Sequence, residues 1–556
     1  MSDNVKHRAP LYEALLRYKK ANHASFHVPG HKNGQAYRMG SNDRATELDQ
    51  IMEIDVTEIN GTDDLHHPEG VIKEAQQQAA SLFGAEETYF LVGGSTAGNL
   101  ALILSVCTAP GDVLLVQRNV HKSVIHGFML AHAQAVFLAP QLHGASGLAT
   151  IPSVETVREA LRRYPGAKGL LVTHPNYYGM GASLAELAEL CHAHGVPLLV
   201  DEAHGAHYGL HPALPVSALA QGADGVVQST HKMLAALTMG AMLHVQGSLL
   251  DRSLLRQRLA MVQSSSPSYP IMASLDLSRS LLERQGHAAF RDGLAAADWL
   301  RQAIHTALPR FGILKTGSSG EDAAYTTQDP FKLVLYDAFG GSNGYELQDK
   351  LETAGCIPEM SDERFVVLAL SLGTTMEDAE RLYQALQEIS EGAGNGYETK
   401  GENEEGRAGG DLARKQEQKH GHQQEQEQMQ QPRQKDEKKS SAPSLVSTWN
   451  IETDLEDGVS SPVPFDMQPR SLEDIETVFV EDAQGRTAAE MIIPYPPGIP
   501  LLYPGEAISE RTMNRLKGLR QSGAKCQGAA DSRLNTILVY KHLYKEQTEG
   551  GSTDEE

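Results

Sequence analysis

Cysteine and long apolar runs are both scarce in this chain of 556 residues. The four cysteines, Cys107, Cys191, Cys356 and Cys526, lie far apart without a CxxC pair, which excludes a disulfide framework and suits a reducing cytosol. No apolar stretch approaches the length that spans a bilayer. The N-terminal residues also lack the apolar core of a signal peptide. The sequence therefore predicts a cytoplasmic protein with no membrane partner.

Positive charge is scarce as well. Lysine and arginine number 48 against 71 acidic residues, which gives a formal net charge of −23. A phosphate backbone needs a basic surface, so this balance argues against a nucleic-acid partner. With 40% hydrophobic residues, the chain is long enough for two or three packed domains.

Strands and helices alternate through the first half of the chain. The expected strands lie at 89–92, 113–116, 135–138, 169–173, 196–200 and 225–227, and the expected helices at 100–106, 124–134, 154–162 and 184–194. Each strand is nearly continuous in apolar residues, so both faces of the sheet must be covered. This predicts an α/β domain with a mostly parallel sheet, whose ligands bind beyond the carboxyl ends of the strands.

Polar residues gather at that predicted edge: Ser95, His121, Asn176, Asp201, His204 and Lys232. Lys232 lies in GVVQSTHKMLAALT, between a strand end and an apolar run at 233–237 that is typical of a helix. A desolvated lysine loses its charge, and the neutral amine can attack an aldehyde. The GGSTAGN stretch at 93–99 follows a strand and precedes a helix. It fits either an anion cradle or an ordinary helix cap by Ser95 or Thr96.

Together these residues fit a site for pyridoxal 5'-phosphate. That cofactor needs a lysine for its aldehyde, an acid beside its pyridine nitrogen, a flat partner for its ring and a cradle for its phosphate. Lys232, Asp201 and His121 supply the first three, and the candidates for the phosphate are Ser95, Thr96, Ser229 and His231. The order and spacing of the acid and the lysine resemble fold-type-I enzymes of the aspartate-aminotransferase superfamily.

Several longer motifs resemble the Orn/Lys/Arg decarboxylase family, and most closely its short bacterial biosynthetic arginine decarboxylases. They are HVPGHKNG, GGSTAGN, RNVHKS, DEAHGAH, STHKMLAALT and SSSPSYPIMASLD, with MIIPYPPGIPLLYPGE resembling the family's C-terminal domain. The resemblance covers about residues 5–390 and 445–543. The insert at 391–445 departs from the family, and so does the missing N-terminal flavodoxin-like wing domain of the acid-inducible members, which puts their decameric assembly in doubt.

The resemblance implies an aspartate-aminotransferase-like large domain, a small α+β domain and a C-terminal decarboxylase-family α+β domain. The expected boundaries are 1–308 for the N-terminal segment and large domain, 309–390 for the small domain, 391–444 for a disordered linker, 445–544 for the C-terminal domain and 545–556 for a disordered tail.

The resemblance also implies roles for individual residues. Lys232 would bind the cofactor aldehyde, Asp201 would pair with the pyridinium and His121 would stack on the ring. The phosphate would be held by Ser95, Thr96, Ser229 and His231, with Ser264 and Ser265 offered by a neighbouring subunit, which implies a homodimer or a higher homo-oligomer. His204 would line the cofactor, and His231 or Lys232 would return a proton.

Alternatives remain on the same residues. An aminotransferase would hold the substrate carboxylate with an arginine, which the strand Val367–Ser371 lacks. A zinc site could use His192, His194, His204 and His207 with Asp201, but we expect no metal. The implied reaction is decarboxylation of a cationic amino acid, and the resemblance favours arginine over lysine and ornithine. Candidate acids for its side chain are Asp63, Asp64, Glu69 and Glu506, which could equally be solvated surface acids.

Overall fold

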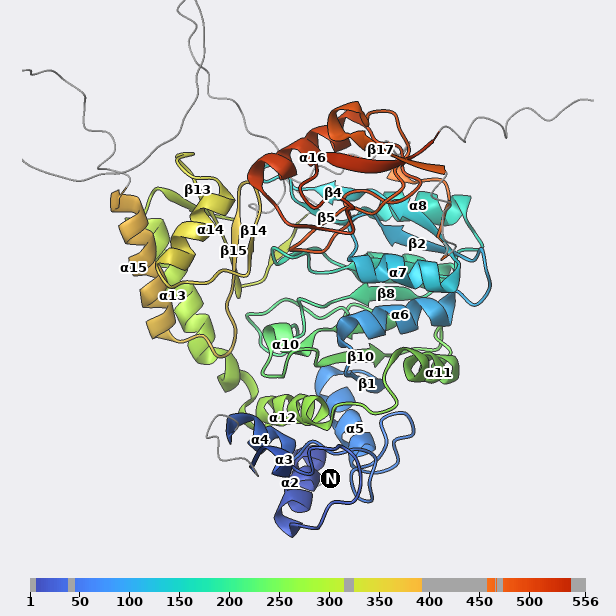
Figure 1. The fold of residues 1–556 in the computed structure, drawn as a ribbon, viewed down its shortest axis with the longest axis vertical. Helices are drawn as coiled ribbons and strands as arrows, with labels where there is room; N and C mark the ends of the chain where they lie inside the picture. Colours follow the sequence, from blue (N-terminus) through green and yellow to red (C-terminus); the bar gives the residue numbers. More distant parts are fainter. Residues whose placement is uncertain are drawn as a thin grey trace, which may run out of the picture.

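The architecture is centred on one eight-stranded sheet, which the computed structural model places in the middle of the molecule (Figure 1). The structure describes residues 7–38, 46–314, 325–392, 458–465, 467 and 474–541. Nearly all of the predicted linker and the whole predicted tail lie outside the described residues. No helix within these ranges is long and apolar enough to cross a membrane.

The strands of the central sheet run mostly in one direction, which confirms the parallel sheet expected from the sequence. β9, β8, β6, β2 and β3 are parallel neighbours, whereas β10 and β16 run antiparallel to the strands beside them. Across the sheet the order is β1 (Glu87–Leu91), β10 (Ala241–Val245), β9 (Gly225–Gln228), β8 (Leu198–Asp201), β6 (Leu170–Thr173), β2 (Val113–Gln117), β3 (Gln134–Leu138) and β16 (Val463–Pro464). The chain segments that follow β8 and β9 therefore begin side by side at one edge.

Helices cover both faces of this sheet, which explains why its strands show no polar alternation. All four residues of β8 are buried. On one face α6 (Gly94–Val106), α7 (Lys122–Ala131) and α11 (Arg252–Val262) share a buried apolar cluster with the strands (Figure 1). The other face packs against α5 (Val71–Phe83), α8 (Val154–Arg163), α9 (Ala185–Ala193) and α12 (Tyr269–Gln285).

The glycine-rich stretch at 93–99 differs from its predicted form. It was expected to be a turn before a helix that starts at residue 100, but α6 already begins at Gly94. Gly94 has a φ of 69°, which a residue with a side chain rarely adopts, and its N–H donates to the Met239 carbonyl oxygen at 3.0 Å. The motif therefore forms the first turns of α6, with its side chains fixed by helical spacing.

The apolar run at 233–237 was wrongly predicted to be a helix. The structure instead has the single-turn helix α10 (Thr230–Met233), which contains Lys232. The chain must then reverse, because the next segment returns as the antiparallel strand β10, which the sequence prediction missed. The reversal is fixed by two bonds: the His231 N–H donates to the Gly240 carbonyl oxygen and the Leu237 N–H to the Ser274 hydroxyl.

A second unit follows the large sheet and contains a four-stranded antiparallel sheet. Its order is β11 (Phe311–Ile313), β13 (Lys332–Asp337), β15 (Val366–Ala369) and β14 (Met360–Ser361). Its helices are α13 (Arg291–Ala307), α14 (Gly344–Thr353) and α15 (Met376–Gly392). The sequence of this region predicts strands at 331–336 and 364–370 and a helix at 376–390, and these elements include all three. It also predicts a helical stretch at about 285–307, which the structure divides into the 3-10 helix η2 (Gly286–Phe290) and α13.

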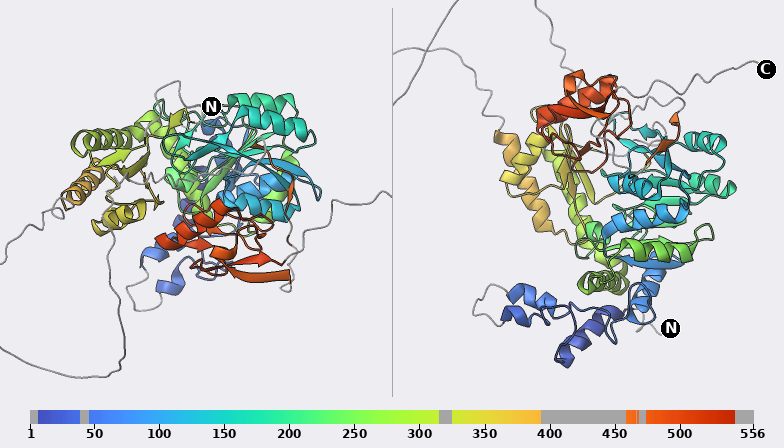
Figure 2. Two further views of the ribbon diagram at one scale, coloured as in Figure 1. Left: turned by 90° about the horizontal axis from the view of Figure 1, so that it is seen from above. Right: turned by 45° about the vertical axis from the view of Figure 1, so that its right-hand side comes forward.

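The C-terminal residues lie against the large sheet (Figure 2). They form the pair β17 (Ile475–Phe479) and β20 (Thr536–Tyr540), the short pair β18 (Ile493–Pro494) and β19 (Cys526–Gln527), η6 (Val480–Asp482) and α16 (Glu510–Ser522). Contact with the sheet is aromatic: the Phe137 and Tyr503 rings stack with centroids 5.2 Å apart. Shorter pairs complete the strands: β4 (Pro140–Leu142) with β5 (Ala149–Pro152), and β7 (Met180–Gly181) with β12 (Thr327–Gln328).

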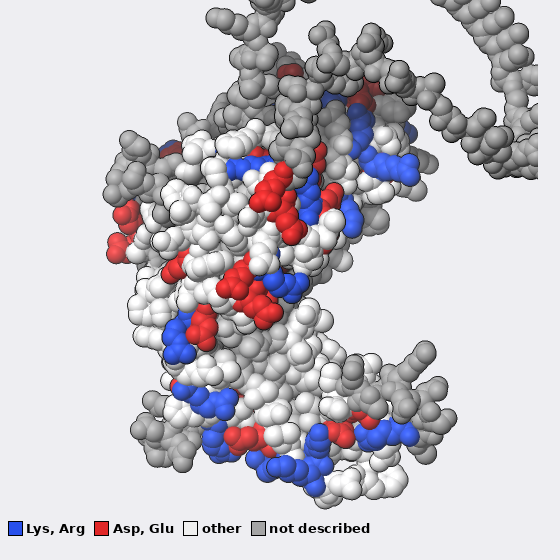
Figure 3. Space-filling model, turned by 90° about the vertical axis from the view of Figure 1, so that its left-hand side faces the viewer, with Lys and Arg blue, Asp and Glu red and all other residues white. Residues whose placement is uncertain are grey.

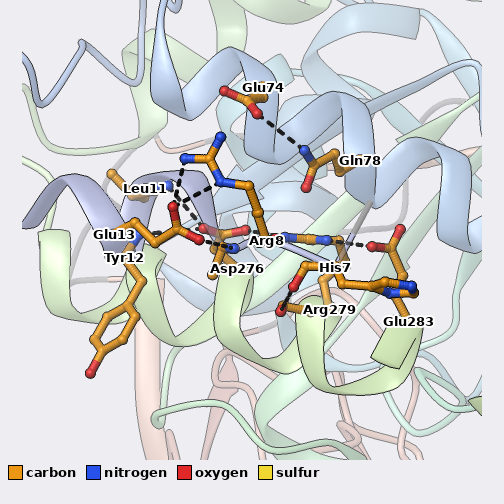
Figure 4. Close-up of polar contacts among 12 residues, drawn as sticks. His7, Arg8, Leu11, Tyr12, Glu13, Glu74, Gln78, Asp276, Arg279 and Glu283 are labelled. Carbon is orange, nitrogen blue, oxygen red and sulfur yellow. Dashed lines mark hydrogen bonds and ion pairs between the residues drawn. The ribbon is translucent and has the colours of Figure 1, made fainter. Parts of the chain in front are cut away.

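The N-terminal helix α2 (Pro10–Ala21) is held against α12 by a backbone hydrogen bond to a buried ion pair within α12 (Figure 4). The Leu11 N–H donates to the Asp276 carboxylate at 2.9 Å, and Arg279 pairs with the same carboxylate at 2.7 Å, both charged side chains being fully buried. Beyond α2 the chain forms α3 (Gln35–Arg38) and α4 (Thr46–Met52). Figure 3 shows a hollow in the surface between the lower part of the molecule and the body above it. Acidic and basic side chains are interspersed on this face.

Candidate active site

The two segments that leave β8 and β9 bring Lys232 into contact with His204. The Lys232 amine lies 3.0 Å from His204 Nε2. Although the Lys232 side chain is exposed as a whole, the protein atoms crowding its amine desolvate it and lower its pKa, against the opposing effect of Asp201. His204 is buried, and desolvation together with the nearby lysines lowers its pKa well below the ordinary value. The imidazole of His204 is therefore neutral near pH 7.

A chain of hydrogen bonds connects the other two principal residues of the predicted site. The Asn99 amide donates to Asp201 Oδ2 at 2.8 Å and to the Ser123 hydroxyl at 3.0 Å. That hydroxyl lies 2.9 Å from Nδ1 of His121. Burial raises the pKa of Asp201, and the bond from Asn99 opposes the rise. Burial is the main cause that lowers the pKa of His121 to about 3, so its ring is neutral.

Two of the predicted phosphate ligands meet at the first turn of α6. The Ser95 and Ser229 hydroxyls lie 2.7 Å apart, one from α6 and one from the residue before α10. Thr96 lies exposed in the same turn of α6. The free N–H groups of a helix start attract an anion, and the hydroxyl pair adds donors beside them.

His231 is oriented by the backbone. Its Nδ1 lies 2.9 Å from the Gly240 carbonyl oxygen, so this nitrogen carries the proton and donates. Burial lowers the pKa of His231. In the neutral form its Nε2 is then a hydrogen-bond acceptor. To donate a hydrogen bond to a phosphate, or a proton to the substrate, the ring of His231 must be protonated.

Ser264 and Ser265 lie on the exposed loop between α11 and α12. The Ser264 carbonyl oxygen accepts a hydrogen bond from His66 at 2.8 Å. Within the described part of the chain no hydrogen bond joins the two serines to Lys232 or its neighbours. The structure thus leaves them outside the cluster, and their supply to a neighbouring subunit stays a prediction.

Most of the acids predicted for the substrate side chain already have other partners. Asp63 accepts the N–H groups of Glu69 and Gly70 at the start of α5, and although burial raises its pKa, these bonds lower it overall. The Asp64 carboxylate accepts the N–H of His66. Glu69 itself is exposed.

Glu506 forms an ion pair with Arg118 at 2.9 Å and accepts the Tyr503 N–H at 3.0 Å. Arg118 is nearly fully buried, and its guanidinium lies 4.0 Å from the Tyr503 ring centroid. This pair therefore binds the C-terminal elements to the large sheet, since Arg118 follows β2. The carboxylate of Glu506 is thus already neutralised by the guanidinium of Arg118.

The histidines considered for zinc are separated. His192 contacts Asp224 at 2.9 Å, His194 contacts the Leu190 carbonyl oxygen at the end of α9, and His207 contacts Asp329 at 3.0 Å. In the described ranges no group of three or more histidine, cysteine, aspartate or glutamate side chains is arranged to hold a metal ion.

Sequence reasoning missed four further residues that contact residues of the predicted site. Asn99 and Ser123 connect Asp201 to His121. The only signal in the sequence was their spacing: Asn99 lies four residues after Ser95, and Ser123 lies two residues after His121. Lys332 comes from the second unit and contacts His204 Nδ1 at 3.4 Å. The centroids of the Tyr177 and His204 rings lie 4.2 Å apart. The Tyr177 hydroxyl donates a hydrogen bond to Glu359 at 2.7 Å.

Models of one protein family match most of this chain. The model of the Orn/Lys/Arg decarboxylase major domain matches residues 9–378, and that of the same family's C-terminal domain matches residues 467–530. The chain belongs to the Orn/Lys/Arg decarboxylase family, as the sequence motifs suggested.

Individual relatives agree with this assignment. An uncharacterized protein of Bacillus subtilis, YaaO, is 39% identical over 96% of this chain and 98% of its own length. An arginine decarboxylase of Halalkalibacterium halodurans is 34% identical over the same shares of the two chains. The constitutive lysine decarboxylase of Escherichia coli superposes with a TM-score of 0.70 and 21% identity, over 97% of this chain and 82% of that one, which supports the fold.

Proposed function

We propose that this chain is a pyridoxal-phosphate-dependent decarboxylase that converts arginine to agmatine and carbon dioxide. The observation that carries the proposal is that a buried acid, Asp201, ends β8 while a desolvated amine, Lys232, follows the neighbouring parallel strand β9 at the same sheet edge. The predicted assembly is a homodimer or higher homo-oligomer in the cytoplasm.

The residues present fit the cofactor. Asp201 is only 4% exposed, and no cation lies within ion-pair distance of it in the described residues. Its partners are the Asn99 amide and the Ala203 N–H. A buried carboxylate is costly without an opposite charge, and a protonated pyridine nitrogen would supply one. The hydroxyl pair of Ser95 and Ser229 at the start of α6 similarly fits a phosphate.

Pyridoxal phosphate would supply an aldehyde for an amino group and an electron-poor ring that takes up electrons as a carboxylate leaves. Lys232 would hold the aldehyde covalently, and the carboxylate of Asp201 would keep the ring nitrogen protonated. His121, neutral through burial, would lie against the ring without adding charge. In the reaction the bond between Cα and the carboxylate breaks, carbon dioxide leaves, and Cα takes a proton, for which His231 and Lys232 are the candidates.

Arginine is proposed because the curated relatives that are named for a substrate and match at 32% to 34% identity over at least 90% of this chain are arginine decarboxylases. Lysine decarboxylases match at 23% to 26%. The stretch Val367–Ser371, which begins in β15, contains no arginine, and this supports decarboxylation over transamination. A strong ion pair would stabilise the substrate carboxylate in the ground state and so hinder its departure.

The test is release of carbon dioxide from arginine, lysine and ornithine by the purified full chain with added pyridoxal phosphate. We expect the highest kcat/KM with arginine, and agmatine as the product. Faster release from lysine or ornithine would overturn the substrate but leave the reaction class. No release from any of the three would overturn the class. The Lys232→Ala variant should be inactive, and Lys168→Met, which removes a surface lysine paired with Asp112, should retain activity.

A further inference from the structure

Lys332 is a buried lysine that the proposed reaction does not yet use. Its side chain is 2% exposed, and in the described residues no carboxylate lies within ion-pair distance of its amine. The amine contacts His204 Nδ1 at 3.4 Å and lies 5.9 Å from the centre of the Tyr177 ring. Lysine is almost never fully buried without a partner, so this arrangement requires a physical reason.

His204 separates two lysines, and this restricts the protons that the three groups can hold. Lys232 contacts Nε2 at 3.0 Å, and Lys332 contacts Nδ1. An ammonium group only donates hydrogen bonds, whereas a neutral imidazole accepts at one nitrogen and donates at the other. Two ammonium groups therefore cannot both be satisfied by a neutral His204. One lysine must be a neutral amine that accepts the N–H of the ring.

Each lysine has a buried carboxylate nearby, Asp201 for Lys232 and Asp329 for Lys332, and the two carboxylates differ in their hydrogen bonds, since both oxygens of Asp201 already accept one. Asp329 lies in the turn that leads to Lys332, and the Lys332 N–H donates to the Asp329 carbonyl oxygen at 3.1 Å. The Asp329 carboxylate is fully buried and has one oxygen without a hydrogen-bond partner within the described chain, so it provides a counter-charge for an ammonium nearby. Desolvation lowers the pKa of Lys332, and the carboxylates of Asp329 and Glu359 oppose that effect.

The backbone holds Lys332 in place. Gly179 has a φ of 77°, and a Cβ added there would lie 2.6 Å from Cβ and Cγ of Lys332. The stem of the lysine thus packs directly on the Gly179 backbone, in the turn that carries Tyr177. The centre of the Tyr177 ring lies 5.7 Å from the Lys232 amine as well, so one aromatic ring lies near both lysines.

We propose that Lys332 is a positioning residue: its ammonium donates to His204 Nδ1, which fixes the ring proton on Nε2 and keeps Lys232 as the neutral amine. Lys232 is then oriented by the Nε2–H group and ready to attack an aldehyde. This inference rests on the proposed role of Lys232 but not on the choice of arginine as substrate. Without Lys332 the ring proton would move to Nδ1, and Lys232 would become an ammonium that donates to Nε2.

The first test needs no variant. Nitrogen-15 NMR of the full-length chain without cofactor reports the protonation of each His204 nitrogen, with the signal assigned by its loss in His204→Gln. The expected result is a neutral ring with its proton on Nε2. A proton on Nδ1 would assign the ammonium to Lys232 and overturn the proposal, and so would an imidazolium ring.

The second test measures the pKa of the Lys232 amine through its rate of labelling in the cofactor-free chain. The charged or titratable groups that act on this amine are Asp201, Lys332, Glu359, His204, His121 and His231. Lys332→Met removes one positive charge and should raise the Lys232 pKa by about one unit. Lys332→Arg keeps the charge and should restore much of the original pKa.

The matched control is Lys168→Met, which removes a half-exposed lysine paired with Asp112 and should leave the Lys232 pKa unchanged. An equal pKa in Lys332→Met and in the control would overturn the proposal. If Lys332→Met does not fold, the tautomer of His204 in the unaltered chain decides the question. Failure of Lys232 to bind pyridoxal phosphate at all, in a chain with the expected tautomer, would instead reject the proposed function.

Discussion

Asn99 offers a test of the site that the sequence alone did not suggest. Its amide, 1% exposed, is the one side-chain donor to Asp201 among the described residues, and it also holds the Ser123 hydroxyl that faces His121. A hydrogen bond to a charged group contributes about 1.5–3 kcal/mol. Asn99→Ala removes that contribution from the ionised form of Asp201. Since one pKa unit corresponds to about 1.4 kcal/mol, the pKa of Asp201 should rise by about one to two units.

The affinity of Asn99→Ala for the cofactor should fall as the pKa of Asp201 rises, because only the ionised Asp201 carboxylate can pair with a protonated pyridine nitrogen. The same free energy corresponds to a loss of about 10-fold to 100-fold in affinity for pyridoxal phosphate, measured by spectroscopic titration of the cofactor-free chain. The control is Asn343→Ala, which removes the capping box of α14 and should reduce stability by about 1 kcal/mol without changing cofactor affinity. A folded Asn99→Ala chain that binds the cofactor as tightly as the unaltered protein would refute the reasoning.

Two further predictions concern stability. Arg279→Met leaves the fully buried Asp276 carboxylate without its cation and should reduce the unfolding free energy, measured in urea, by about 3–5 kcal/mol. The control Arg291→Met removes an exposed ion pair and should change the unfolding free energy by less than about 1 kcal/mol. Equal effects of the two substitutions would contradict this prediction. Desolvation raises the pKa of Glu202 from 4.5 to about 8, so the folded state binds this proton more tightly than the unfolded chain. Its contribution to stability is complete below pH 4.5 and is lost as the pH rises through 8. Glu202→Gln should flatten that decline, and an unchanged pH profile would exclude this source.

The sequence predicted the elements whose pattern is local. Strands such as β2 and β8 are continuous apolar runs, and parallel strand order places the end of β8 at Asp201 and the segment with Lys232 after β9 at the same edge. The residues that determine the charge states at this edge are different. Lys332 reaches His204 only because the second unit folds back onto the large sheet, and nothing in its own neighbourhood along the chain signals that contact.

The error at 233–237 and the choice that the sequence left open for Glu506 have the same physical origin. The run at 233–237 has a helical pattern, but the return of the chain as β10 prevents a helix there, and that pairing is set by residues on both sides of the turn. Glu506 has the charge that a cationic substrate requires, yet the structure pairs it with Arg118 from the end of β2. Propensity and charge describe single residues, whereas tertiary packing decides which partner each one meets.

The most direct measurement of the central claim is the site of covalent attachment. The full chain, incubated with pyridoxal phosphate and reduced with borohydride, should carry the cofactor on the amine of Lys232 in peptide mass spectrometry, and the visible absorbance of the bound form should be absent in Lys232→Ala. Attachment to Lys332 or to another lysine, or a chain that stays colourless with added cofactor, would contradict the account.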